Sequence, residues 1–141
     1  MLVHGANHGG WCLARVGRLL RAAGHDVFTP TLTGFGERAH LLGPEIGPQS
    51  LVDDVVGVLE NEELTDTVLV GHSFGSLVTL GVADRVPDRI ARLVMIDGVV
   101  VEPGHSGSTG YLPRPGSRAT PPPSATTAAC PTHHRLRPGS A

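Results

Sequence analysis

The stretch Gly71-His72-Ser73-Phe74-Gly75 decides the fold of this chain. It follows the apolar run Val68-Leu69-Val70 and precedes a helical pattern from Leu77 to Val86. A strand, a sharp turn and a helix, with a serine at the apex, are what the G-x-S-x-G nucleophile elbow requires. The turn is tight, so Gly71 and Gly75 provide the small residues that it needs. The sequence therefore predicts that Ser73 stands above a sheet, beside backbone N–H groups of a helix start.

A second motif, His4-Gly5-Ala6-Asn7-His8-Gly9-Gly10-Trp11, directly follows the apolar pair Leu2-Val3. In serine hydrolases with such an elbow, a glycine-rich loop after an earlier strand supplies a second donor to the oxyanion. Glycine allows the backbone to come close to a substrate. We therefore expect this loop to lie beside Ser73. The alternative is a tight strand-to-helix connection without a chemical role.

These motifs, in this order, resemble the N-terminal part of an α/β-hydrolase. Within that superfamily they are most similar to small esterases, plant-type methylesterases and hydroxynitrile lyases. The resemblance runs from residue 1 to about residue 103, and is also carried by Ala22-Ala23-Gly24-His25 and Leu32-Thr33-Gly34-Phe35-Gly36-Glu37-Arg38. It implies that Ser73 is the nucleophile and that the N–H groups of Ala6 and Phe74 form the oxyanion hole. Gly71, His72 and Gly75 would complete the elbow.

Composition excludes several other classes of protein. The 141 residues carry a net charge of −2, and 40% of them are hydrophobic, as in a soluble globular chain. All 11 basic residues are arginine, without a basic face that interleaves aromatic residues, so we expect no nucleic-acid partner. No apolar run reaches about 18 residues and no signal peptide is visible, so we expect no membrane partner and a cytoplasmic location. No cofactor is implied, because acyl transfer through a serine needs none.

The amino-acid composition changes near residue 102, although the values for the whole chain do not show it. Residues 1–101 carry a net charge of −5, whereas residues 102–141 carry +3 and hold 8 of the 12 prolines. The second segment contains no Val, Ile, Phe or Met. It cannot bury enough apolar surface to offset its ordering entropy, so we predict a partial hydrolase domain over 1–101 and a disordered tail over 102–141. We hypothesise a truncated or frameshifted coding sequence as the origin of this change.

Along residues 1–101, strand and helix patterns alternate, which is typical of a parallel α/β sheet. Strands are expected at 2–3, 25–29, 67–70 and, as a buried strand, 93–96. Helices are expected at 11–23, at 50–62 with Ser50 and Asp53 as a capping box, and at 74–85. The family topology implies about four strands in the order second, first, third, fourth. The fourth strand then has an exposed apolar edge, which invites self-association.

A serine nucleophile needs a base, and the base needs an acid that orients it. The strands that carry this acid and histidine in the family have no match here, because residues 104–141 contain no strand pattern and no Asp or Glu. Asp97, at the end of the last predicted strand, is a candidate acid, and a turn or cap residue is the alternative. His105, His133 and His134 have no scaffold to hold them near Ser73.

Other polar and aromatic residues near the motifs have structural explanations as well. For His4 and His8 we favour a structural hydrogen bond over a role as base. For Glu37 and Arg38 we favour bracing of their loop over substrate contact. Trp11 is expected to line an acyl pocket or, alternatively, to pack in the core.

Three functions follow from these observations. The first is a serine hydrolase of carboxylic esters with impaired activity. The second is a hydroxynitrile lyase-like enzyme, which the absence of lysine disfavours. The third is a non-catalytic fragment or binding module, suggested by the missing histidine. The sequence leaves open whether the chain is an enzyme. Its substrate would be a small-molecule ester.

Overall fold

A computed structural model describes residues 1–98 of the chain. Its strands are β1 (Leu2–Val3), β2 (Thr67–His72) and β3 (Ile90–Ile96), and its α-helices are α1 (Ala14–Ala22), α2 (Pro48–Asn61) and α3 (Gly75–Arg85). Short 3-10 helices are η1 (Gly10–Leu13), η2 (Gly36–Leu41) and η3 (Pro87–Arg89). None of the helices in this part of the chain is long and apolar enough to cross a bilayer. The tail predicted over residues 102–141 lies outside the described residues.

The three strands form one parallel sheet in the order β1-β2-β3. This is the order predicted for the first, third and fourth strands. The segment 25–29, predicted to be a further strand, is not one. Its Phe28 carbonyl accepts a hydrogen bond of 2.9 Å from the Leu2 N–H, so it runs beside β1. Because β1 is only two residues long, it offers too few backbone groups for a regular ladder.

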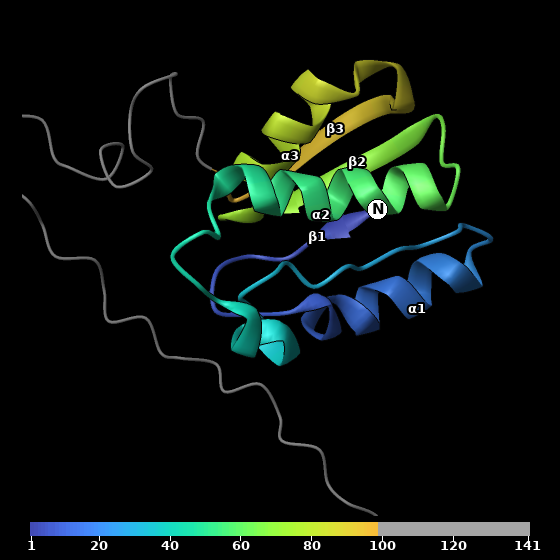
Figure 1. The fold of residues 1–141 in the computed structure, drawn as a ribbon. Helices are drawn as coiled ribbons and strands as arrows, with labels where there is room; N and C mark the ends of the chain where they lie inside the picture. The colour runs from blue at the N-terminus through green and yellow to red at the C-terminus, as the bar shows by residue number, and fades with distance from the viewer. Residues whose placement is uncertain (99–141) are drawn as a thin grey trace, which may run out of the picture. The chain divides into compact units, whose positions relative to one another are not determined.

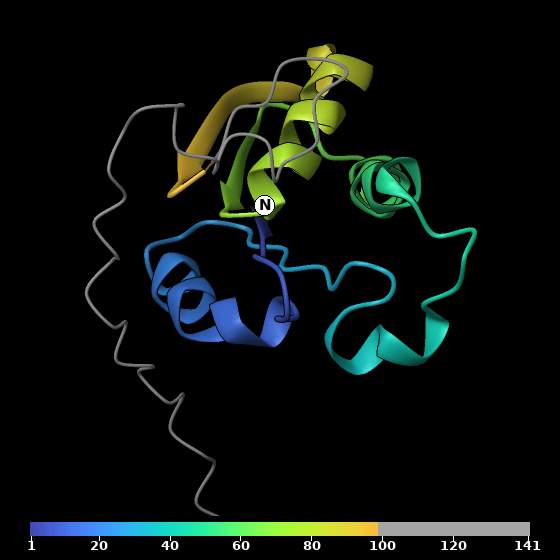
Figure 2. The same cartoon turned by 90° about the vertical axis from the view of Figure 1, so that its left-hand side faces the viewer.

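Helices cover the two faces of the sheet unequally. Helices α2 and α3 pack together on one face, and α1 lies on the other side (Figures 1 and 2). The core lies under α2 and α3, where Val55, Leu59, Leu69 and Val82 are fully buried. Alternation along β2 produces this arrangement, because Leu69 faces the core whereas Val68 is 48% exposed. The elbow therefore joins a strand and a helix that share one core.

Helix α2 begins at Pro48, two residues before the predicted start. The prediction of Ser50 as the N-cap, in a capping box with Asp53, was wrong. Gly47 is the N-cap, and its N–H donates to the Ser50 hydroxyl at 3.4 Å, which places Ser50 at the third helical position. Proline favours the first helical position because its fixed φ suits a helix and it has no N–H to leave unpaired.

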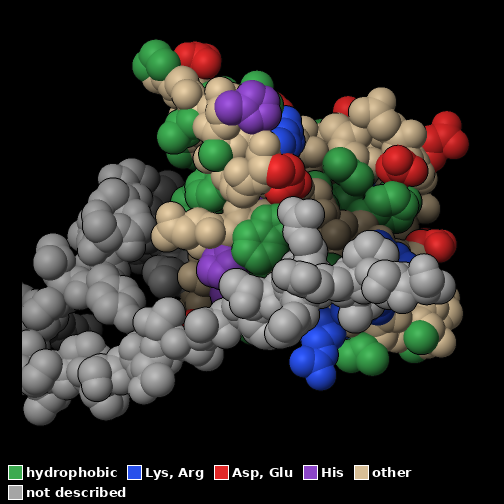
Figure 3. Space-filling model, turned by 90° about the horizontal axis from the view of Figure 1, so that it is seen from below, with side chains coloured by type: hydrophobic (Ala, Val, Ile, Leu, Met, Phe, Trp, Pro, Cys, Tyr) green, Lys and Arg blue, Asp and Glu red, His purple; other side chains and the backbone are tan. Residues whose placement is uncertain are grey.

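Strand β3 was predicted to be buried, and this was wrong. Met95 is 41% exposed and Ile96 is 52% exposed, because no strand among residues 1–98 pairs with the outer edge of β3. Helix α1 also presents apolar side chains to solvent, with Leu19 at 67%. On the side seen from below in Figure 1, apolar, acidic, basic and histidine side chains are interspersed (Figure 3). The visible part of this face therefore has no patch of side chains that all carry the same sign of charge.

Candidate active site

Ser73 lies at the apex of the turn between β2 and α3. Its φ is +51°, in the left-handed region that residues other than glycine rarely adopt. The turn is held on both sides, because the Ser73 N–H donates to the Ile96 carbonyl at 2.9 Å and the Ser73 carbonyl accepts from the Ser76 N–H at 2.9 Å. A strained serine fixed by its neighbours at a strand-to-helix turn is the geometry of a nucleophile elbow.

Steric limits require glycine on either side of this serine. A Cβ on Gly71 would lie 2.7 Å from Ser76 Cα and 2.8 Å from the Gly75 carbonyl oxygen. A Cβ on Gly75 would lie 2.5 Å from the His4 carbonyl oxygen and 2.8 Å from that of Val3. All four contacts involve backbone atoms, which cannot rotate away. The small residues predicted at the two positions are thus needed by the tertiary structure.

The glycine-rich loop after β1 lies against the elbow, as the sequence predicts. A Cβ on Gly5 would lie 3.3 Å from Ser73 Cβ and 3.0 Å from His72 Nδ1. Parallel pairing explains this proximity, because Val3 lies opposite Gly71 and the carboxyl ends of β1 and β2 meet at the same edge of the sheet. Two segments that are more than 60 residues apart in sequence therefore form one site.

Two backbone donors at this edge are unpaired within the described chain. Neither the Ala6 N–H nor the Phe74 N–H donates a hydrogen bond to any group of residues 1–98. Ala6 belongs to the loop beside Ser73, and Phe74 directly follows the serine at the start of α3. Unpaired donors beside a nucleophile are able to stabilise negative charge that develops on a carbonyl oxygen.

The His4 side chain is fully buried, and both of its ring nitrogens are engaged. Nδ1 lies 2.8 Å from the Gly5 carbonyl oxygen, and Nε2 accepts a hydrogen bond of 3.1 Å from the Leu32 N–H. Burial lowers the pKa of the imidazole, so the neutral ring is favoured. The predicted structural hydrogen bond is confirmed.

Within residues 1–98, no histidine ring forms a hydrogen bond with the Ser73 hydroxyl. The exposed His8 ring bonds to the Ala6 carbonyl through Nδ1 at 2.7 Å, as predicted for a structural role. His72 Nδ1 lies against Gly5. His105, His133 and His134 lie outside the described residues. The described part of the site therefore provides a serine and backbone donors, with no ring nitrogen in place as a base.

Asp97 follows β3 at the same edge of the sheet. The bond from Ser73 to Ile96 makes Asp97 a neighbour of the serine across the two strands. Asp97 is exposed, has a φ of +50°, and its carboxylate makes no hydrogen bond or ion pair within residues 1–98. It is placed near the site and nothing in the described chain fixes its side chain.

Trp11 is 52% exposed, so it does not pack in the core. A Cβ on Gly9 would lie 2.6 Å from its Nε1, and its ring centroid is 6.1 Å from that of His8. The indole therefore covers the glycine-rich loop and leaves an aromatic surface open beside it.

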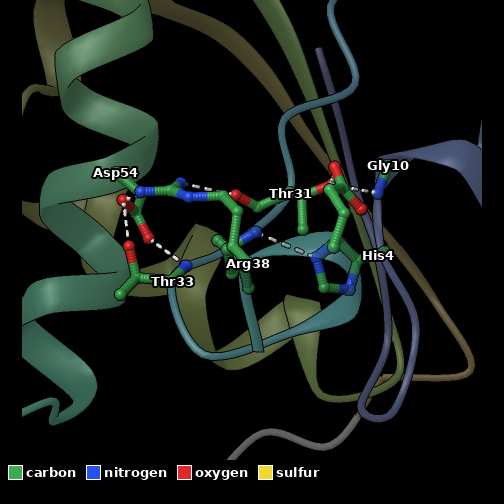
Figure 4. A network of polar contacts seen from close by, with 8 residues as sticks. His4, Gly10, Thr31, Thr33, Arg38 and Asp54 are labelled. Atoms are coloured by element: carbon green, nitrogen blue, oxygen red, sulfur yellow. Dashed lines mark hydrogen bonds and ion pairs between the residues drawn. The ribbon is translucent and has the colours of Figure 1, made fainter. Parts of the chain in front are cut away.

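Glu37 and Arg38 brace the loop that follows Pro30, as expected from the sequence. Figure 4 shows Arg38 between Thr31 and Asp54. The Thr31 hydroxyl donates to Glu37 at 2.6 Å and accepts from the Gly10 N–H at 2.8 Å. Arg38 donates to the Thr31 carbonyl at 2.7 Å and pairs with Asp54 at 3.2 Å. The hydrogen bond from Thr31 is the main cause that lowers the pKa of the Glu37 carboxyl.

Sequence reasoning missed Asp54, which connects this loop to α2. Its carboxylate accepts hydrogen bonds from the Thr33 N–H at 2.6 Å and the Thr33 hydroxyl at 2.9 Å. Its side chain is 13% exposed, whereas that of neighbouring Asp53 is 62% exposed. Nothing in the sequence separates two adjacent aspartates on one helix. Only packing against the loop does so.

Comparisons with known proteins agree with this geometry. The model of the alpha/beta hydrolase family matches residues 1–140, and the chain belongs to this family. The α/β-hydrolase resemblance found in the motifs is thus confirmed.

Among individual relatives, the chain is 52% identical over 106 residues to a carbendazim hydrolyzing esterase of Nocardioides sp. (strain SG-4G), covering 75% of this chain and 44% of the relative. It is 33% identical over 123 residues to a pyrethroid hydrolase of Sphingobium wenxiniae, covering 86% of this chain and 43% of the relative. The chain therefore spans less than half the length of these relatives.

Solved structures show the same fold. A pyrethroid hydrolase from Sphingobium faniae JZ-2 superposes with a TM-score of 0.67 at 33% identity, over 79% of this chain and 44% of that one. An extracellular alpha/beta-hydrolase from a Paenibacillus species superposes with a TM-score of 0.66 at 32% identity, over 72% of this chain and 40% of that one.

Proposed function

We propose that this chain carries the nucleophile and the oxyanion hole of a serine hydrolase that acts on small carboxylic esters. One observation carries the proposal: Ser73 is held at a strained turn beside two N–H groups, of Ala6 and Phe74, that are unpaired within residues 1–98. Preorganised donors of this kind are usually the largest single contribution to acyl transfer. The relatives named as esterase and hydrolase support the same class of substrate.

In the proposed reaction, Ser73 Oγ attacks the ester carbonyl carbon, and its proton passes to a base. The carbonyl oxygen becomes an oxyanion that accepts hydrogen bonds from the Ala6 and Phe74 N–H groups. The tetrahedral intermediate then expels the alcohol, which takes up the proton, and leaves an acyl group on Ser73. Water attacks this acyl group in a second step and releases the acid. Both steps need a proton acceptor, which residues 1–98 do not place beside the serine.

Asp97 is our candidate for the acid that orients such a base. Its position next to Ser73, on the neighbouring strand end, supports this role. We expect Asp97→Asn to slow acylation of Ser73, because an amide orients and stabilises an imidazolium less well than a carboxylate does. Trp11 is our candidate for contact with the acyl group, because its exposed indole lies beside the glycine-rich loop.

Intact mass after treatment with a fluorophosphonate probe tests the proposal. Ser73 Oγ would attack phosphorus and displace fluoride, giving one adduct per chain that is lost in Ser73→Ala. That result also means that a base is recruited from residues beyond 98 or from a second chain. No adduct on folded protein would overturn the proposal. Saturable binding of an ester without turnover would then favour the binding-module alternative.

Further features of the chain stay predictions from its sequence. The outer edge of β3 carries the exposed side chains of Met95 and Ile96, which supports self-association through this edge. We expect sedimentation to show an association that Met95→Lys weakens, because a charge on an edge strand opposes pairing. A cytoplasmic location, and the absence of membrane or nucleic-acid partners, are likewise proposed from composition.

A further inference from the structure

We propose that His4 is a positioning residue for the oxyanion hole, and that it acts by holding the peptide unit between Gly5 and Ala6. The inference rests on the proposed function and adds to it a residue that sets the direction of one donor. The starting observation is the contact of 2.8 Å between His4 Nδ1 and the Gly5 carbonyl oxygen. The Ala6 N–H belongs to the same peptide unit as this oxygen.

The geometry of a peptide bond connects the two groups. All peptide bonds of the described chain are trans, so the Gly5 carbonyl and the Ala6 N–H point in opposite directions in one plane. A hydrogen bond that holds the carbonyl toward the His4 ring therefore directs the N–H away from it. The exposure of the two residues is consistent with these opposite directions, because Gly5 is buried whereas Ala6 is exposed. The peptide unit thus crosses from the core to the surface beside Ser73.

The opposite side of the ring fixes which nitrogen carries the proton. Nε2 accepts a hydrogen bond from the Leu32 N–H at 3.1 Å, so this nitrogen is unprotonated. In a neutral ring the proton then lies on Nδ1, which donates to the Gly5 carbonyl. Edge-to-face contact with Phe35, at 5.7 Å between ring centroids, holds the plane of the ring. The orientation of the His4 ring is therefore set by Leu32 and Phe35, independently of its contact with Gly5.

Residue shape provides a matched pair of variants. The amide nitrogen of asparagine falls near the position of histidine Nδ1, so His4→Asn keeps a donor toward Gly5 and loses the acceptor for Leu32. The amide oxygen of glutamine reaches the position of Nε2, so His4→Gln keeps the acceptor and loses the donor. Each variant removes one of the two buried hydrogen bonds, so we expect both to lose a similar amount of stability in urea unfolding.

Labelling rates with the fluorophosphonate probe separate positioning from mere support of the fold. We expect His4→Asn to react within about threefold of the original chain, and His4→Gln to react about 10- to 100-fold more slowly, because a misdirected donor loses most of its effect on the oxyanion. Equal rates in the two variants, or rates that follow the folded fraction measured by urea unfolding, would overturn the inference.

A magnetic resonance experiment tests His4 without requiring Ser73 to react. In the unsubstituted, isotope-labelled chain we expect the proton on Nδ1 and a scalar coupling across the hydrogen bond to the Gly5 carbonyl carbon. We also expect the Ala6 amide resonance to move in His4→Gln and to stay in His4→Asn. A proton on Nε2 refutes the inference. If the chain takes no adduct at all, the proposed function fails, and these resonances alone decide the role of His4.

Discussion

Gly75→Ala tests the tight approach of helix α3 to strand β1. The added Cβ would lie 2.5 Å from the His4 carbonyl oxygen and 2.8 Å from the Val3 carbonyl oxygen. Both are closer than real Cβ atoms come to other atoms, and both neighbours are backbone of the glycine-rich loop and β1. The clash therefore cannot be relieved by a change of rotamer, and α3 must shift.

We expect this substitution to lower the free energy of unfolding by about 3 kcal/mol, at the upper end of the usual cost of overpacking. For a domain of about 100 residues, that corresponds to a fall of roughly 12–24 °C in Tm. Urea unfolding followed by circular dichroism provides the free energy, and a thermal melt provides Tm. The same shift displaces Ser73 from the Ala6 N–H, so labelling by the fluorophosphonate probe should also slow beyond the loss of folded protein.

Gly57→Ala is the matched control. Gly57 lies inside α2, and the nearest atom to an added Cβ is Asn61 Nδ2 at 3.9 Å, which is an ordinary contact. Alanine should therefore stabilise the helix by about 0.5–1 kcal/mol. The structure thus predicts opposite signs for one chemical change at two helical glycines. A Gly75→Ala variant within about 1 kcal/mol of the original chain would refute the steric argument for the elbow.

Three further perturbations have expected outcomes. Asp54→Ala should lower the free energy of unfolding in urea by about 3 kcal/mol, because it leaves several hydrogen-bond donors of the braced loop unpaired. Asp53 forms an exposed ion pair with Arg85, so Asp53→Ala should lower it by less than about 1 kcal/mol. Equal losses in the two variants would contradict the argument that packing against the loop distinguishes the two aspartates. Ser73→Gly should be about 1 kcal/mol more stable than Ser73→Ala, because only glycine relieves the strain at a φ of +51°. Acid should destabilise the fold in two stages. Burial is the largest cause that lowers the pKa of His4 in the folded chain. The contribution of neutral His4 to stability is therefore complete above its ordinary pKa of 6.5, and it is lost as the pH falls from 6.5 through the lower folded pKa. The pKa of Glu37 is lowered mainly by the hydrogen bond from Thr31, so its contribution to stability is lost in the second stage, as the pH falls from 4.5 through the lower folded pKa. Urea unfolding measured over a series of pH values should show both stages in the original chain and only the second stage in His4→Asn.

Local patterns explain why much of the fold was predictable. The elbow is encoded within five consecutive residues, and its two glycines meet steric needs that any strand-to-helix turn of this kind imposes. The alternation of short apolar runs with helical patterns predicted a parallel sheet, and the family resemblance implied the order in which β1, β2 and β3 lie. The segment 25–29 was misjudged because its strand-like composition depends on a partner, and β1 offers only two residues.

The exposed outer edge of the last strand was expected, but the prediction that this strand is buried failed. Residues 93–96 have the composition of a buried strand, yet Met95 and Ile96 are exposed at the outer edge of β3. The composition of a strand indicates which of its side chains are apolar. It does not indicate whether another element of the fold covers them. The α2 start failed for a local reason, since Pro48 competes with Ser50 for the beginning of the helix.

By itself, the sequence determined the identity of the site: a serine at a glycine-flanked turn, a glycine-rich loop after the first strand, and membership in the alpha/beta hydrolase family. These features are local, because short-range sterics and hydrophobic periodicity act over a few residues. Tertiary structure decided which polar groups meet. It brought Gly5 against Ser73, buried His4 between Gly5 and Leu32, and chose Asp54 over Asp53 as the brace of the loop. Such choices depend on distances between segments far apart in the chain, which parallel strand pairing and core packing set together.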